Sequence, residues 1–141
     1  MDCKTPIRWH FPPLNNGPVK HLGLVLNHHR LRTCLAYQIA YFVLSDLAKS
    51  WGEQFDKANA ILDSSSPNEG YYHKYLIPLE NYSLTAKQIL FAAGVAWVFG
   101  GMESWNDIGF DNKEDNNIYE RLSEQLYSKI NEAIVATTNT Y

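Results

Sequence analysis

The sequence predicts a mainly α-helical protein: a single compact domain, residues 1–141, of three or four long helices with an irregular N-terminal arm. Two observations support this prediction. Apolar residues recur three or four residues apart through three long stretches, which is the spacing of a buried helix face. The length of 141 residues is that of one domain, whose core can bury roughly 68% of the surface that the unfolded chain exposes.

The N-terminal arm is predicted from proline content. The first 30 residues contain four of the six prolines, namely Pro6, Pro12, Pro13 and Pro18. Proline lacks a backbone N–H and blocks the continuation of a helix, so we expect this stretch to be extended and irregular. Within it, a short strand is the further expectation for residues 22–26.

A long buried helix is predicted next. Helical spacing of apolar residues begins at Leu31 and continues through Trp51 and Phe55 to Leu62. Gly52 either breaks this helix or merely weakens it, and the turn-forming residues 64–70 end it.

Two further helices follow. The first is expected over residues 84–99, with Ser83 as its N-cap and Gly100 and Gly101 as its C-terminal stop. It is apolar nearly all round, which is typical of a central core helix. The last helix is expected over residues 115–136, where apolar residues keep an i, i+4 row: Ile118, Leu122, Leu126, Ile130 and Ile134.

Composition and charge exclude several function classes. The net charge of −3 argues against a dedicated nucleic-acid binder, although the basic N-terminal third with its aromatic residues could stack bases. The longest apolar stretch, residues 89–99, is too short to cross a membrane, and the N-terminus has no signal-peptide core. Cys3 and Cys34 have no metal or redox spacing, so we expect free thiols in a reducing compartment, the cytoplasm.

Motifs for cofactor or metal chemistry are also missing. No histidine or cysteine pair has zinc-ligand spacing, the loop from Asp111 fails the EF-hand pattern, and no glycine-rich phosphate loop or serine-hydrolase elbow occurs. We therefore expect no cofactor, no metal and no catalysis. The alternatives are a small enzyme that uses His28 or His29 with an acid such as Asp107, and a non-catalytic adaptor or regulatory domain.

An acidic segment spans residues 103–120, in which six carboxylates are opposed by Lys113 alone. One explanation is a solvated loop that leads into the acidic first turn of a helix, where the helix dipole favours negative charge. The other is a partner-binding surface. Trp105 has two corresponding roles: it anchors a partner, or it folds back onto the core with its indole N–H donating to a carbonyl group.

Residues 98–107, Val-Phe-Gly-Gly-Met-Glu-Ser-Trp-Asn-Asp, resemble the Gly-Gly-Met-Gly-Ser-Trp-Asn-Asp segment of small bacterial immunity proteins. These proteins are encoded next to contact-dependent or other polymorphic toxins, and Glu103 stands where the family has glycine. The resemblance implies a cytoplasmic protein that binds a cognate toxin domain and blocks its active site.

The charge pattern extends this expectation to particular residues. Such toxins are often nucleases with basic clefts, so carboxylates on the inhibitor would oppose toxin lysines or arginines. A homodimer through exposed aromatic residues is an open alternative. The residues predicted to bind the partner are Glu103, Trp105, Asp107, Asp111, Glu114 and Asp115.

Overall fold

The computed structural model describes residues 18–42, 49–69, 79–100 and 105–140. These ranges contain four α-helices and no strand, so the prediction of a mainly α-helical protein is confirmed for them. The helices are α1 (Pro18–Phe42), α2 (Lys49–Ile61), α3 (Leu84–Val95) and α4 (Lys113–Thr138), with the short 3-10 helices η3 (Leu79–Asn81) and η4 (Trp105–Asp107).

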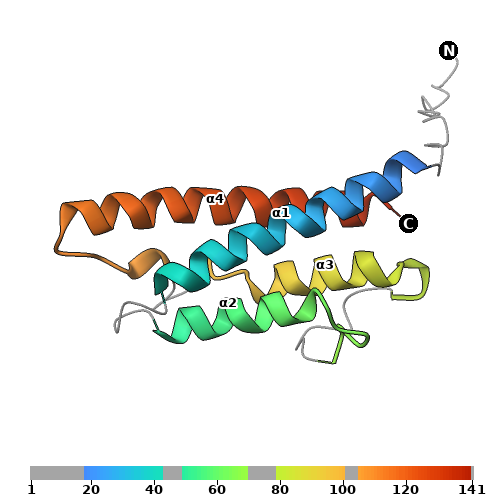
Figure 1. Cartoon of the computed structure of the whole chain (residues 1–141), viewed down its shortest axis with the longest axis horizontal. Helices are drawn as coiled ribbons and strands as arrows, with labels where there is room; N and C mark the ends of the chain where they lie inside the picture. Colours follow the sequence, from blue (N-terminus) through green and yellow to red (C-terminus); the bar gives the residue numbers. More distant parts are fainter. Residues whose placement is uncertain (1–17, 43–48, 70–78, 101–104, 141) are drawn as a thin grey trace, which may run out of the picture.

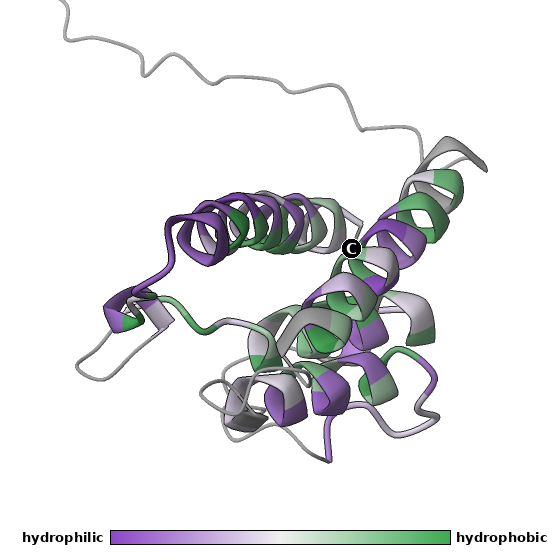
Figure 2. Cartoon of the chain, turned by 60° about the vertical axis from the view of Figure 1, so that its left-hand side comes forward, coloured by the Kyte–Doolittle hydropathy of each residue, from purple (hydrophilic) through white to green (hydrophobic). Residues whose placement is uncertain are grey.

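Successive helices run in opposite directions, with α1 and α4 above α2 and α3 (Figure 1). Helix α1 packs against each of the other three, and α3 packs against both α2 and α4. The apolar residues of all four helices meet in one core cluster, and η4 contributes Trp105 to it. The green residues of α4 lie toward the other helices and its purple residues lie outside (Figure 2).

The prediction for the N-terminal region is wrong from residue 18 onward. Helix α1 begins at Pro18 and includes residues 22–26, which were expected to form a strand. Proline is favoured in the first turn of a helix, where its missing N–H has no acceptor to lose. Leu24 and Leu31 of this helix are buried in the core, so tertiary packing supports the helical backbone. Residues 1–17 of the predicted arm lie outside the described part of the chain.

The long helix predicted from Leu31 is divided into two. Helix α1 ends at Phe42 and α2 begins at Lys49, and the two helices pack against each other in opposite directions (Figure 1). Gly52 does not mark the division, because it is a buried residue inside α2. Apolar spacing did not reveal the reversal, since both helices bury an apolar face and the pattern continues on either side of it.

The predicted N-cap of α3 and the predicted apolar row of α4 agree with the structure. The Ser83 hydroxyl accepts a hydrogen bond from the Ala86 backbone N–H at 3.2 Å, which confirms it as the N-cap of α3. Helix α3 ends at Val95 with Ala96 as its C-cap, four residues earlier than expected, so the predicted stop at Gly100 is wrong and Gly101 lies outside the described residues. Gly100 instead has a φ of +94° in the segment after the helix. Helix α4 is slightly longer than expected, and its buried residues include Leu122, Leu126 and Ile130.

Candidate partner-binding surface

Trp105 connects the loop before α4 to two helices. Its side chain is completely buried. The indole ring lies at centroid distances of 5.8 Å from Trp51 and 5.4 Å from Phe55, both in α2. On its other side it lies 5.2 Å from the ring of Tyr119 in α4. The η4 segment is therefore held between α2 and α4 by one large aromatic side chain.

The polar groups of Trp105 are also satisfied inside the protein. The indole N–H donates to the Ser123 hydroxyl at 2.7 Å, and the Tyr119 hydroxyl donates to the Trp105 carbonyl oxygen at 2.5 Å. The Ser123 hydroxyl in turn donates to the Tyr119 carbonyl oxygen at 2.7 Å. Burial raises the pKa of Tyr119 above its ordinary value, because the phenolate would be poorly solvated there.

These contacts correct the prediction that Trp105 anchors a partner. A completely buried side chain offers no surface to another protein, so the structure supports the alternative in which Trp105 folds back onto the core. The acceptor of its indole N–H is a serine hydroxyl and not the expected carbonyl group. The aromatic residues of α2 make this position favourable, and their proximity to residue 105 is a tertiary contact that local sequence does not reveal.

Four of the predicted acidic residues belong to η4, to the start of α4 or to the segment between them, at one end of the molecule (Figure 1). Asp107, Asp111 and Glu114 are exposed and Asp115 is half-buried. Glu103 lies outside the described residues. The structure therefore brings four of the five predicted carboxylates to the same end of the bundle.

The acidic end includes a capped helix N-terminus. Asn112 caps α4, and its side-chain oxygen accepts a hydrogen bond from the Glu114 backbone N–H at 2.9 Å. Glu114 and Asp115 occupy the first turn, where the helix dipole favours negative charge, so a structural role for these two acids also holds. Within the described residues, neither Asp111 nor Glu114 takes part in an ion pair.

An exposed group of aromatic residues was missed by the sequence reasoning. We call Trp97, Phe99 and Tyr127 the aromatic cluster. Trp97 is 41% exposed and Tyr127 is 52% exposed, and the three ring centroids lie 5.3–5.9 Å apart. The Trp97 indole N–H donates to the Phe99 carbonyl oxygen at 2.9 Å. The only sequence signal was the high aromatic content, since residues 97–99 were assigned to a helix buried on all sides.

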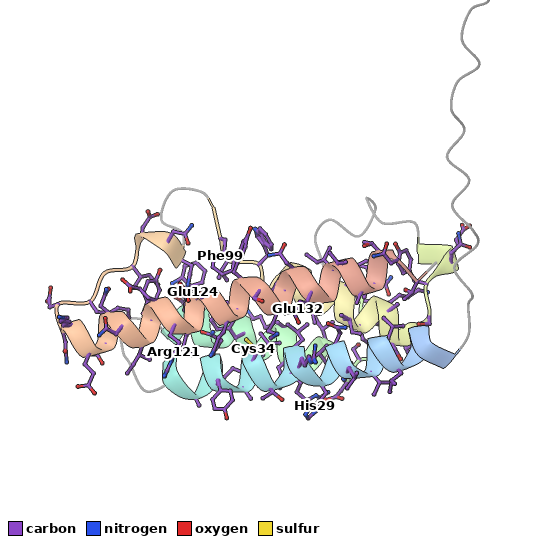
Figure 3. The ribbon with its side chains drawn as sticks, turned by 90° about the horizontal axis from the view of Figure 1, so that it is seen from above. His29, Cys34, Phe99, Arg121, Glu124 and Glu132 are labelled. Atoms are coloured by element: carbon purple, nitrogen blue, oxygen red, sulfur yellow. The ribbon has the colours of Figure 1, made fainter. Side chains whose placement is uncertain are left out.

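The aromatic cluster lies beside two exposed carboxylates of α4, Glu120 and Glu124. Glu124 lies on the same side of α4 as Phe99, whereas Arg121 lies on the side that faces α1 (Figure 3). Glu120 and Glu124 are both exposed. Carboxylates and aromatic rings thus share one face of the protein.

His28 and the predicted acid Asp107 lie near opposite ends of α2. The His28 ring nitrogen Nε2 lies 2.9 Å from the Leu62 carbonyl oxygen, just beyond the last residue of α2. Asp107 belongs to η4, which contacts α2 near its beginning through Trp51. The helix therefore separates His28 from Asp107.

A shallow groove of about 390 Å³ lies between α1 and α4, with His29, Cys34 and Lys129 among its lining residues. Burial raises the pKa of Cys34 to about 11, so its thiol is protonated at neutral pH and is a poor nucleophile. In the part of the chain that the structure describes, no group of three or more metal-ligating side chains could hold an ion.

Comparison of the chain with family models, curated proteins and solved structures gives no match. Among the described helices, none has both the length and the apolar character needed to cross a membrane.

Proposed function

We propose that this protein is a non-catalytic cytoplasmic immunity protein that binds a cognate bacterial toxin domain, a nuclease, and occludes its basic active-site cleft. The observation that supports this function best is the exposed acidic end of the molecule. Asp107, Asp111 and Glu114 are exposed there on a capped helix and the segment that leads into it.

The carboxylates of the acidic end would influence both the rate and the site of toxin binding. A nuclease cleft holds phosphate groups with lysine and arginine side chains, so a row of carboxylates can occupy the same positions. Opposite charges also accelerate encounter and orient the two proteins before contact. Carboxylates at the start of a helix can both occupy the phosphate positions and steer the encounter, without a large loss of conformational entropy on binding.

The resemblance of residues 98–107 to immunity proteins adds independent support. Within this segment Trp105 is part of the core, and Asp107 follows two residues later in η4. We infer that the segment acts as a structural signature, which positions the acidic residues next to it. The toxin contact itself is then made by the carboxylates.

The decisive experiment is inhibition of the toxin encoded directly upstream. The triple variant Asp107→Asn, Asp111→Asn, Asp115→Asn should lose inhibition by roughly a hundredfold or more, since close charge pairs at interfaces each contribute about 1.5 kcal/mol or more. Circular dichroism and thermal melting should show that the variant remains folded.

A matched control changes the net charge equally at another place. The triple variant Glu53→Gln, Asp56→Asn, Glu80→Gln replaces exposed acids outside the acidic end and should inhibit like the original protein. Nanomolar inhibition by the first triple variant would contradict the proposed function of the acidic end. Failure of the unmodified protein to bind the toxin at all would contradict the proposed class of protein.

A further inference from the structure

We propose that the aromatic cluster is the binding site for an arginine side chain of the partner protein, with Glu120 and Glu124 pairing with its guanidinium group. This inference rests on the proposed function, because it assigns a chemical anchor to the same protein–protein interface. At the acidic end only carboxylates would bind the partner, whereas at the aromatic cluster both rings and carboxylates would bind it.

The rings of the aromatic cluster are exposed although they pack against one another. Trp97 and Tyr127 expose 41% and 52% of their surface, although each ring is in contact with the other two. Phe99 meets Trp97 at 80° and Tyr127 at 88°, which are favourable edge-to-face arrangements. A partner that binds these rings therefore meets side chains that are already largely immobilised, so little side-chain entropy is lost.

Trp97 and Phe99 present aromatic surface to a ligand. The Trp97 indole N–H already donates to the Phe99 carbonyl oxygen at 2.9 Å, and Phe99 has no polar side-chain group. These two residues consequently present aromatic surface rather than hydrogen-bond donors. Aromatic surface binds apolar groups and, through the negative charge of the ring face, cations.

Negative charge lies beside the rings. Glu124 and Glu120 precede Tyr127 by three and seven residues in α4, so both lie on its side of the helix and Glu120 is about 10 Å away along the axis. Figure 3 places Glu124 on the side of α4 that carries Phe99 and places Arg121 on the other side. Lys129 is paired with Glu132 at 2.7 Å. This local charge favours a cationic group and disfavours an anionic one.

Arginine fits this combination better than lysine. Its guanidinium group is planar, so it stacks on an aromatic ring while its N–H groups bind a carboxylate in a bidentate manner. The ammonium group of lysine is compact and more strongly hydrated, so it loses more solvation at the same place. Arginine is also among the residues most often found at the energetic centre of protein interfaces.

The test uses the full chain and fluorescein-labelled peptides, with fluorescence anisotropy as the readout. The probe is a hexa-arginine peptide with fluorescein on its N-terminus and an amidated C-terminus, and the comparison peptide is hexa-lysine labelled in the same way. The arginine peptide should bind more tightly than the lysine peptide. Tyr127→Ala and Trp97→Ala, which leave the net charge unchanged, should each weaken arginine-peptide binding by about tenfold.

Two control variants separate this site from general attraction. Tyr37→Ala removes a side chain that is 64% exposed on α1, and Glu53→Gln removes an exposed charge from α2; neither should change arginine-peptide binding by more than twofold. Glu124→Gln should weaken it by about threefold. Circular dichroism verifies folding, and Tyr127→Ala provides the test if Trp97→Ala fails to fold.

The contrary outcomes are equally definite. Equal binding of the two peptides, or unchanged arginine-peptide binding by Tyr127→Ala, would overturn the proposal. So would a homodimer in sedimentation experiments that Tyr127→Ala dissociates, since the cluster would then bind a second copy of the chain. A toxin complex that tolerates Tyr127→Ala contradicts this inference alone, whereas an intact peptide site without any toxin complex contradicts only the proposed function.

Discussion

Two tryptophans only eight residues apart have opposite environments. Trp105 is completely buried between α2 and α4, and its indole N–H and its carbonyl oxygen both have hydrogen-bond partners in α4. Trp97 is 41% exposed, and its indole N–H bonds only two residues along the chain. The comparison teaches that the aromatic residues of one short segment serve two purposes. Trp105 meets aromatic rings of both α2 and α4 and is part of the core, whereas Trp97 meets Phe99 and, in α4, Tyr127 and remains partly exposed.

The largest loss of stability is expected from Trp105→Ala. The substitution leaves a cavity where the rings of Trp51, Phe55 and Tyr119 meet, so the free energy of unfolding should fall by about 3–5 kcal/mol. Urea denaturation followed by far-UV circular dichroism measures it. A loss below about 1 kcal/mol would show that Trp105 does not join the helices in solution.

The second largest loss of stability is expected from Ser123→Ala. This change removes the hydroxyl acceptor of the Trp105 indole N–H and leaves that buried donor without its partner, at a cost of about 1–3 kcal/mol. Chemical denaturation again provides the measurement. Ser128→Ala is the matched control, because Ser128 is an exposed serine of the same helix and its loss should cost less than about 0.5 kcal/mol. Equal effects of the two changes would contradict the assigned hydrogen bond.

Tyr119 makes the buried site sensitive to alkaline pH. Because burial raises the pKa of Tyr119 above 10.0, this phenol contributes stability that is complete below its unfolded pKa and is lost as pH rises through its folded pKa. The free energy of unfolding should therefore fall less steeply above about pH 10 in Tyr119→Phe than in the original protein. Denaturation at pH 7 is the reference condition. The prediction would be refuted if the free energy of unfolding fell equally steeply with pH in both proteins.

The smallest effect on stability is expected from Trp97→Ala. The free energy of unfolding should change by less than about 1 kcal/mol, because the lost ring is partly exposed and contacts only Phe99 and Tyr127 among the described aromatic rings. Comparison with Trp105→Ala under the same conditions checks this difference directly. A loss as large as that of Trp105→Ala would remove the distinction between core and surface aromatic residues.

Local patterns were enough to predict much of the fold. The cap at Ser83 and the i, i+4 row through Leu122, Leu126 and Ile130 follow from hydrogen-bonding chemistry and helical periodicity, and the structure confirms both. The acidic end was also predictable, because its carboxylates are neighbours in the chain and α4 keeps them together. These features depend on residues a few positions apart.

Tertiary structure decided the remaining features. The reversal between α1 and α2, the burial of Trp105 and the exposure of Trp97 all depend on which helices meet. Apolar spacing identifies the buried face of a helix, but it contains no information about the segment that packs against that face. For Trp105 that segment is α2, about 50 residues earlier in the chain. The sequence by itself therefore determined α3, α4 and the acidic end, whereas packing between distant segments decided the reversal between α1 and α2 and which aromatic residues remain exposed.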